Sequence, residues 1–175
     1  MASLPHSKTV TYEEWLRMPE VRDEEVVNGE IRKMPSPLLP HARIIQSLYD
    51  LIRPQVGRRE VEIFISTFDL IISRAPLTAR VPDLAVCKVD TIVERDGRMH
   101  SAPQLVVEVR SAEKLADYAR LGVPEVWAFS PEDRAVQVLY LEDGQYRRQA
   151  RLTEGFLRPK LFPNVEVQIS EIWPE

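Results

Sequence analysis

Apolar runs alternate with polar turns along the chain, and three of these segments have the pattern of helices. Residues 40–55 carry apolar side chains at three- and four-residue intervals, which predicts a helix with one buried face. Residues 112–121 predict a second helix, which Gly122 ends. Residues 11–17 begin with a Thr-x-x-Glu capping box and predict a shorter helix.

The other apolar runs predict β-strands. Residues 104–110 are almost continuously apolar, as in a strand covered on both faces. An Asn-Gly pair between two alternating runs predicts a hairpin over residues 24–34. Further strands are expected at residues 60–72, 81–88, 125–129, 135–141, 145–152 and 165–169, with turns or connections at 73–79, 90–102 and 130–133. Because residues 104–129 are expected to form a strand–helix–strand unit, we predict an α/β fold with a mixed β-sheet, flanking helices and an N-terminal hairpin.

Composition narrows the function classes without selecting one. At 175 residues the chain is expected to form one domain, residues 1–175, with a loose terminus over residues 1–10. A net charge of −4 argues against a generally basic nucleic-acid-binding surface, but not against a local basic groove. We expect no membrane segment, and the single cysteine, Cys87, fits a reducing compartment, so the cytoplasm is the expected location.

Charged residues interrupt the most apolar part of the chain. Asp83 precedes one strand, Glu108 and Arg110 lie two residues apart in another, and Lys114 begins the following helix. Residues two apart on a strand point to the same side, so Arg110 is expected beside Glu108. A buried carboxylate is costly unless it is paired or binds a metal. Two interpretations remain open: a metal site, or ion pairs that only neutralise buried charge.

These motifs resemble a large bacterial family of predicted restriction endonucleases within the PD-(D/E)XK nuclease superfamily. The resemblance rests on Pro-Asp, Glu-Val-x-Ser and Lys-x-x-x-Tyr-x-x-x-Gly-Val in that order, after an Asn-Gly-Glu hairpin. It covers about residues 12–146. It implies a single restriction-endonuclease-like nuclease domain and hydrolysis of DNA phosphodiester bonds with Mg²⁺ or Mn²⁺ as cofactor.

The resemblance also implies roles for individual residues. Carboxylates and one backbone carbonyl would bind the metal, and a cation would face the phosphate. Lysine is the better catalytic candidate, because arginine holds its proton and suits a phosphate contact. His41, at the start of the long helix, matches a histidine of the family. The expected metal ligands are Asp83, Glu108, Glu30 and the Val109 carbonyl, and the expected catalytic residues are Asp83, Glu108, Lys114 and Arg110.

The chain departs from the family between Glu108 and Lys114, where relatives carry a longer polar loop. With five residues between them, Lys114 reaches Glu108 only if the chain bends back, whereas Arg110 needs no bend. We therefore expect Arg110 to be the closer cation and nuclease activity to be weak. The alternative is a nuclease-fold protein with weakened or lost catalysis that acts as a binding or regulatory module. A homodimer is expected, since superfamily members often pair to cut both DNA strands.

Overall fold

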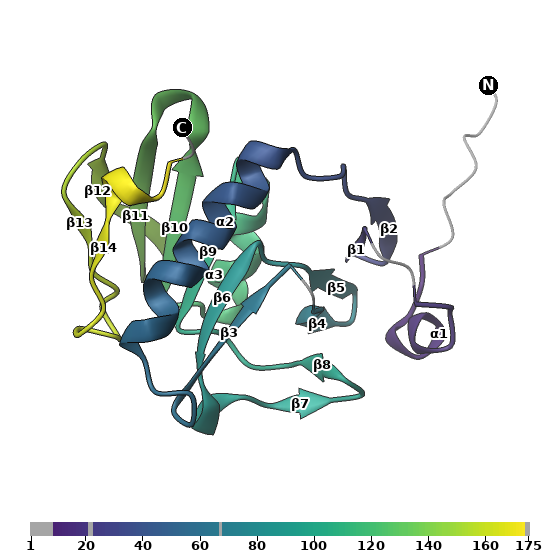
Figure 1. Cartoon of the computed structure of the whole chain (residues 1–175). Coiled ribbons are helices and arrows are strands. Elements are labelled where there is room, and N and C mark those ends of the chain that lie inside the picture. The colour runs from purple at the N-terminus through teal and green to yellow at the C-terminus, as the bar shows by residue number, and fades with distance from the viewer. Residues whose placement is uncertain (1–8, 21–22, 67, 174–175) are drawn as a thin grey trace.

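The computed structural model describes residues 9–20, 23–66 and 68–173, which form two six-stranded sheets, a two-stranded sheet and three α-helices (Figure 1). In spatial order, the first sheet contains β2 (Glu30–Lys33), β1 (Glu24–Val27), β5 (Leu77–Arg80), β4 (Leu70–Arg74), β8 (Arg98–Met99) and β7 (Glu94–Arg95). The second contains β12 (Gln145–Leu152), β11 (Ala135–Glu142), β10 (Glu125–Ser130), β9 (Leu105–Val109), β6 (Leu84–Lys88) and β3 (Val61–Ile65). The small sheet pairs β13 (Phe156–Leu157) with β14 (Val167–Gln168).

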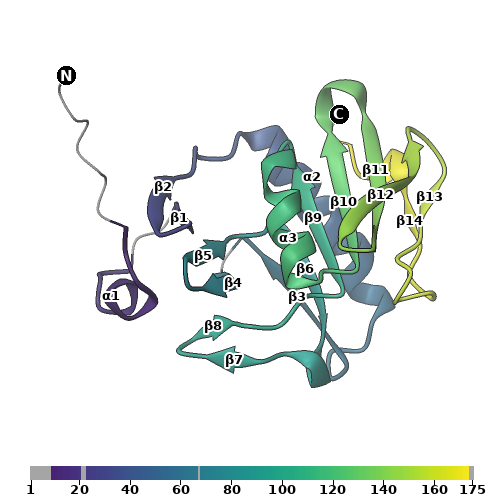
Figure 2. The same ribbon diagram turned by 180° about the vertical axis from the view of Figure 1, so that it is seen from behind.

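Helices cover both faces of the second sheet. In Figure 1, α2 (Leu39–Ile52) crosses the near face, and Figure 2 shows α3 (Leu115–Leu121) on the opposite face. The apolar face of α2 packs in one core with Val107, whereas Tyr118 of α3 packs in another with Val106. Successive residues of a strand point to opposite faces, so this alternation along β9 directs Glu108 toward α3.

The first sheet carries the short helix α1 (Tyr12–Leu16). Thr11 and Glu14 form the capping box that its sequence predicts, each side chain bonding the other residue's backbone N–H. The buried ring of Tyr12 packs with Val26, Leu77 and neighbouring apolar residues of β1, β4 and β5. The N-terminal segment is thereby fixed to the sheet that contains the β1–β2 hairpin.

The mixed α/β architecture is confirmed, including the predicted hairpin at Asn28 and parallel pairing of β9 with β10. The strands are divided between two large sheets, because the hairpin joins β4 and β5 in a sheet separate from that of β9 and β10. The supposed turn at residues 73–79 contains most of β5, and the supposed connection at residues 90–102 contains the β7–β8 hairpin. Both errors concern strands too short to show a clear alternation.

Candidate active site

Asp83 lies at the end of the second sheet where β6 begins and β9 ends. Leu84 pairs with Val107 in antiparallel register, so one step further along the strands Asp83 stands opposite Glu108. The Val109 backbone N–H donates to Asp83 Oδ2 at 2.7 Å. His41 Nε2, from the first turn of α2, lies 3.2 Å from Asp83 Oδ1. The sheet register therefore brings together the two acids that the sequence motif singled out.

Glu108 is buried on the α3 side of β9, with 1% of its surface exposed. Burial raises the pKa of its carboxyl well above the usual range; Lys114 opposes this effect and Asp83 reinforces it. The Tyr118 hydroxyl donates to Glu108 Oε1, while Oε2 is buried without a hydrogen-bond partner among the described residues. An oxygen without a hydrogen bond is costly to bury, so Oε2 can accept a ligand cation in addition to its ion pair with Lys114.

Lys114 reaches this carboxylate because the chain bends back directly after β9. A 3-10 turn over residues 112–114 connects the strand to α3 and places Lys114 Nζ 3.5 Å from Glu108 Oε2. The same ammonium donates to the Val81 carbonyl at 2.8 Å and lies 2.9 Å from Glu25 Oε1. Burial acts to lower the Lys114 pKa, but Glu108 and Glu25 outweigh it and raise the pKa, so this lysine is a firmly held cation.

The expectation that Arg110 is the closer cation is wrong. Arg110 has a positive φ of 67°, which ends the extended backbone of β9 and with it the two-residue alternation. Its exposed guanidinium forms an ion pair with Glu132 instead of following Glu108 toward α3. Lys114 thus occupies the position beside Glu108 that the sequence pattern assigned to Arg110.

Residues that the sequence analysis missed complete the cluster. Glu25 of β1 is 5% exposed, and its carboxylate contacts Lys114, the Val81 backbone N–H at 2.8 Å and Arg80 Nη1 at 2.9 Å. Arg80 also lies 2.8 Å from Asp117 Oδ2 on α3. Sequence spacing could have indicated the two cluster members on α3. Asp117 and Tyr118 lie three and four positions after Lys114, and residues at those intervals share one face of a helix. For Glu25 the sequence offers one weak sign, which is that a second acid follows Glu24 directly before the apolar residues of the strand.

The structure places the two less certain candidates differently. His41 touches Asp83, as described, and so belongs to the cluster. The Glu30 side chain is 49% exposed and lies 3.6 Å from Arg32 at the start of β2. The hairpin acid that contacts Lys114 is Glu25, five positions earlier. We therefore leave Glu30 out of the proposed ligand set.

The cluster carries more acid than permanent base. Four carboxylates, those of Glu25, Asp83, Glu108 and Asp117, surround two permanent cations, Arg80 and Lys114. Among the described residues, no three His, Cys, Asp or Glu side chains gather as a cation cage. The residues nevertheless fit Mg²⁺ or Mn²⁺, because Mg²⁺ is usually held by one or two carboxylates together with waters and substrate phosphate. Asp83, Glu108 and the adjacent Val109 carbonyl supply that donor set.

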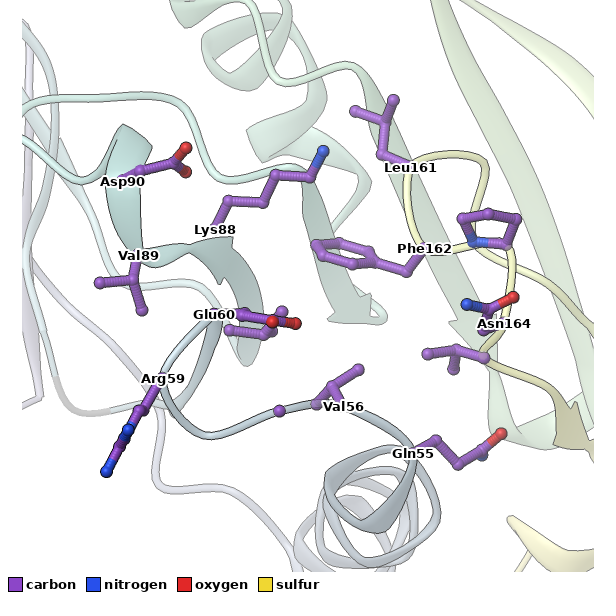
Figure 3. Close-up of a pocket in the computed structure, with 14 residues that line it drawn as sticks. Gln55, Val56, Arg59, Glu60, Lys88, Val89, Asp90, Leu161, Phe162 and Asn164 are labelled. Atoms are coloured by element: carbon purple, nitrogen blue, oxygen red, sulfur yellow. The ribbon is translucent and has the colours of Figure 1, made fainter.

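A separate cavity of about 530 Å³ lies at the opposite end of β6 (Figure 3). Lys88, the last residue of β6, and Phe162 line it, with Lys88 Nζ 6.0 Å from the ring centroid. The five residues of β6 separate it from Asp83, a length of roughly 15 Å at the usual rise per residue. This cavity is therefore not part of the carboxylate site.

Fold comparison defines the class of protein. A solved structure titled "Crystal structure of a putative nuclease belonging to DUF820 from Anabaena variabilis" matches with a TM-score of 0.75 and 18% identity, covering 93% of this chain and 97% of that chain. The fold is thus a restriction-endonuclease-like nuclease fold. The chain belongs to the Uma2 family, described as "Putative restriction endonuclease", whose model matches residues 10–170. Among curated proteins, none matches the chain. Within the described residues, no helix is long and apolar enough to cross a membrane.

Proposed function

We propose that this protein is a DNA endonuclease that depends on Mg²⁺ or Mn²⁺. The observation that carries the proposal is the buried Glu108 Oε2 without a hydrogen-bond partner, on the residue opposite Asp83 and 3.5 Å from Lys114 Nζ. Asp83, Glu108 and the Val109 carbonyl are the proposed metal ligands. A bound divalent cation supplies Lewis-acid stabilisation of the phosphate and lowers the pKa of water.

The chain's own residues prepare the site for that chemistry. The Val109 backbone N–H and His41 hold the two oxygens of Asp83, and Tyr118 orients Glu108. Lys114 presents a fixed positive charge where negative charge develops on a phosphate during hydrolysis. Because Glu25 and Glu108 raise the pKa of Lys114, its proposed role is charge stabilisation and not proton abstraction.

Two measurements test the proposal. One is cleavage of supercoiled plasmid, and the other is the affinity of the protein alone for Mn²⁺, measured by calorimetry. Wild type should nick or linearise plasmid with Mg²⁺ or Mn²⁺ and lose this activity in EDTA. Asp83→Asn should lower the rate by roughly 10²–10³-fold, because a metal contributes several kcal/mol to such a transition state. Asp143→Asn, in the β11–β12 turn, is the matched control and should behave as wild type. Unchanged Mn²⁺ affinity in Asp83→Asn would sink the metal assignment.

A second comparison separates the two cations. Lys114→Met should lower the cleavage rate by about 10²-fold, the effect of removing one preorganised charge donor from a transition state. Arg110→Met should leave the rate unchanged, because Arg110 forms its ion pair with Glu132 on the surface. Rates are measured under single-turnover conditions at saturating metal. Equal losses in the two variants would contradict this assignment of roles.

A further inference from the structure

Two adjacent leucines stand out on the surface near the carboxylate site. Leu38 and Leu39 are 66% and 62% exposed, the highest values among the large apolar side chains of the described residues. They lie where the loop from β2 enters α2, and Figure 1 shows this loop crossing from the hairpin to the helix. Every residue from 35 to 40 is exposed, and three of these six residues are prolines. Proline fixes φ, so the leucines are presented by a stiffened segment.

The charge of the surrounding segment is unusual for this acidic chain. No Asp or Glu occurs between Glu30 and Asp50, the longest such gap in the sequence, although the chain contains 27 acidic residues. Lys33 and Arg43 are exposed within this gap. Arg43 lies four positions after Leu39 on α2, so the two side chains share one face of the helix. Apolar and basic groups are therefore presented together.

The position of this surface ties it to the site. His41 follows Leu39 by two residues and lies 3.2 Å from Asp83. Any polymer whose phosphate reaches Asp83 and Lys114 must pass close to the start of α2. Basic side chains suit its phosphates, and exposed leucines suit a base step, since apolar side chains inserted between bases unstack and bend duplex DNA.

We propose that residues 32–43 form the DNA-contacting surface of the protein, with Leu38 and Leu39 inserting into a base step and Lys33 and Arg43 contacting phosphates. This inference rests on the proposed function for its choice of partner. Beyond the proposed function, it specifies that the bound DNA is a duplex whose stacking is opened at one base step beside the bound phosphate. A second copy of this chain is the competing occupant of the leucine surface.

The test measures fluorescence anisotropy of a short labelled duplex in EDTA, so that no cleavage is needed. Wild type should bind a duplex with a central mismatch more tightly than the perfect duplex, because an unpaired step is cheaper to open. Leu38→Ser/Leu39→Ser should weaken binding about tenfold or more and abolish the preference for the mismatch. Serine at position 38 is a favourable helix N-cap, so the variant should remain folded.

The charge variant should behave differently. Lys33→Gln/Arg43→Gln should weaken binding to both duplexes equally and reduce the slope of log affinity against log salt by about 2, one unit for each lost phosphate contact. Two controls should bind as wild type: Arg147→Gln/Arg148→Gln on β12, and Leu161→Ser beside the distant cavity. A loss of affinity confined to the β12 pair would overturn the inference.

The result is separable from the fate of the nuclease proposal. Cleaving protein whose leucine variant still binds and discriminates as wild type would overturn this inference alone. A protein that does not cleave DNA but shows the predicted binding pattern would support the DNA-contacting surface and contradict the proposed nuclease activity. Light scattering provides the remaining outcome: a leucine variant that converts a dimer to a monomer, with DNA affinity unchanged, would assign the surface to a second copy and overturn the DNA contact.

Discussion

Replacing Glu25 with alanine should destabilise the fold by about 3–5 kcal/mol, the cost of removing one partner from a buried ion pair. Its carboxylate compensates both Lys114 and Arg80 and accepts the Val81 N–H, and it is almost fully buried. Without it, two cations in the interior lose a partner. Urea unfolding at neutral pH measures the effect.

Glu24→Ala provides a matched control for this experiment. Glu24 precedes Glu25 on β1 and pairs with Lys33 across the hairpin register, and its side chain is only half-buried. The control should change the unfolding free energy by about 0.5 kcal/mol or less, as is usual for surface positions. Equal losses in the two variants would show that the strand, and not the ion pairs, accounts for the effect.

Replacing Glu108 with glutamine should remove cleavage and stabilise the metal-free protein. Burial raises the folded-state pKa of Glu108 above its unfolded value. The contribution of this group to stability is therefore fully present below the unfolded pKa and is lost as pH rises through the folded pKa. At pH 8 the uncharged glutamine should increase stability by about 1 kcal/mol or more, a typical gain when a functional group that strains the fold is replaced.

Thermal unfolding of both proteins from pH 5 to pH 8 measures this difference. Because burial raises the pKa of Glu108, the advantage of Glu108→Gln should shrink as pH falls, since the protonated carboxyl resembles glutamine. Added Mg²⁺ should stabilise wild type and leave the variant unaffected, since a ligand stabilises only the protein that binds it. An advantage that is constant with pH would show that charge burial at Glu108 is not its source.

Local patterns and the family motif predicted the acids and the helix lysine, but not how they are assembled. The proximity of Asp83 and Glu108 follows from the pairing of their two strands, and the apolar runs of the sequence indicate both strands. Arg110 was misplaced because the two-residue alternation assumes extended backbone, and a positive φ at that residue breaks it. The proximity of Lys114 to Glu108 was not predicted, because the rise per residue of strand and helix gives the length of the connection but not the direction in which it bends.

Local patterns did not indicate the role of Glu25, for a different reason. Its contacts with Arg80 and Lys114 span 55 and 89 positions of sequence, and they depend on β1 pairing with β5. Most of β5 lies in the segment that local sequence predicts to be a turn, so the sequence offers no partner strand to bring the hairpin to the site. Glu30 was the expected hairpin acid because it matches the acid of the family's Asn-Gly-Glu motif, whereas no motif marks Glu25.

The attachment of the β1–β2 hairpin limits how relatives of this protein can be recombined. One residue pair, Val26 with Ala79, registers β1 on β5, and the Glu25 carboxylate fastens the same strand to Arg80 and Lys114. A chimaera that takes its first 34 residues from another family member keeps the cations Arg80 and Lys114 but replaces the carboxylate that pairs with them. Unless the donor sequence supplies an acid at the Glu25 position, only apolar packing and backbone hydrogen bonds hold the transplanted hairpin, and Lys114 and Arg80 each lose a buried carboxylate partner.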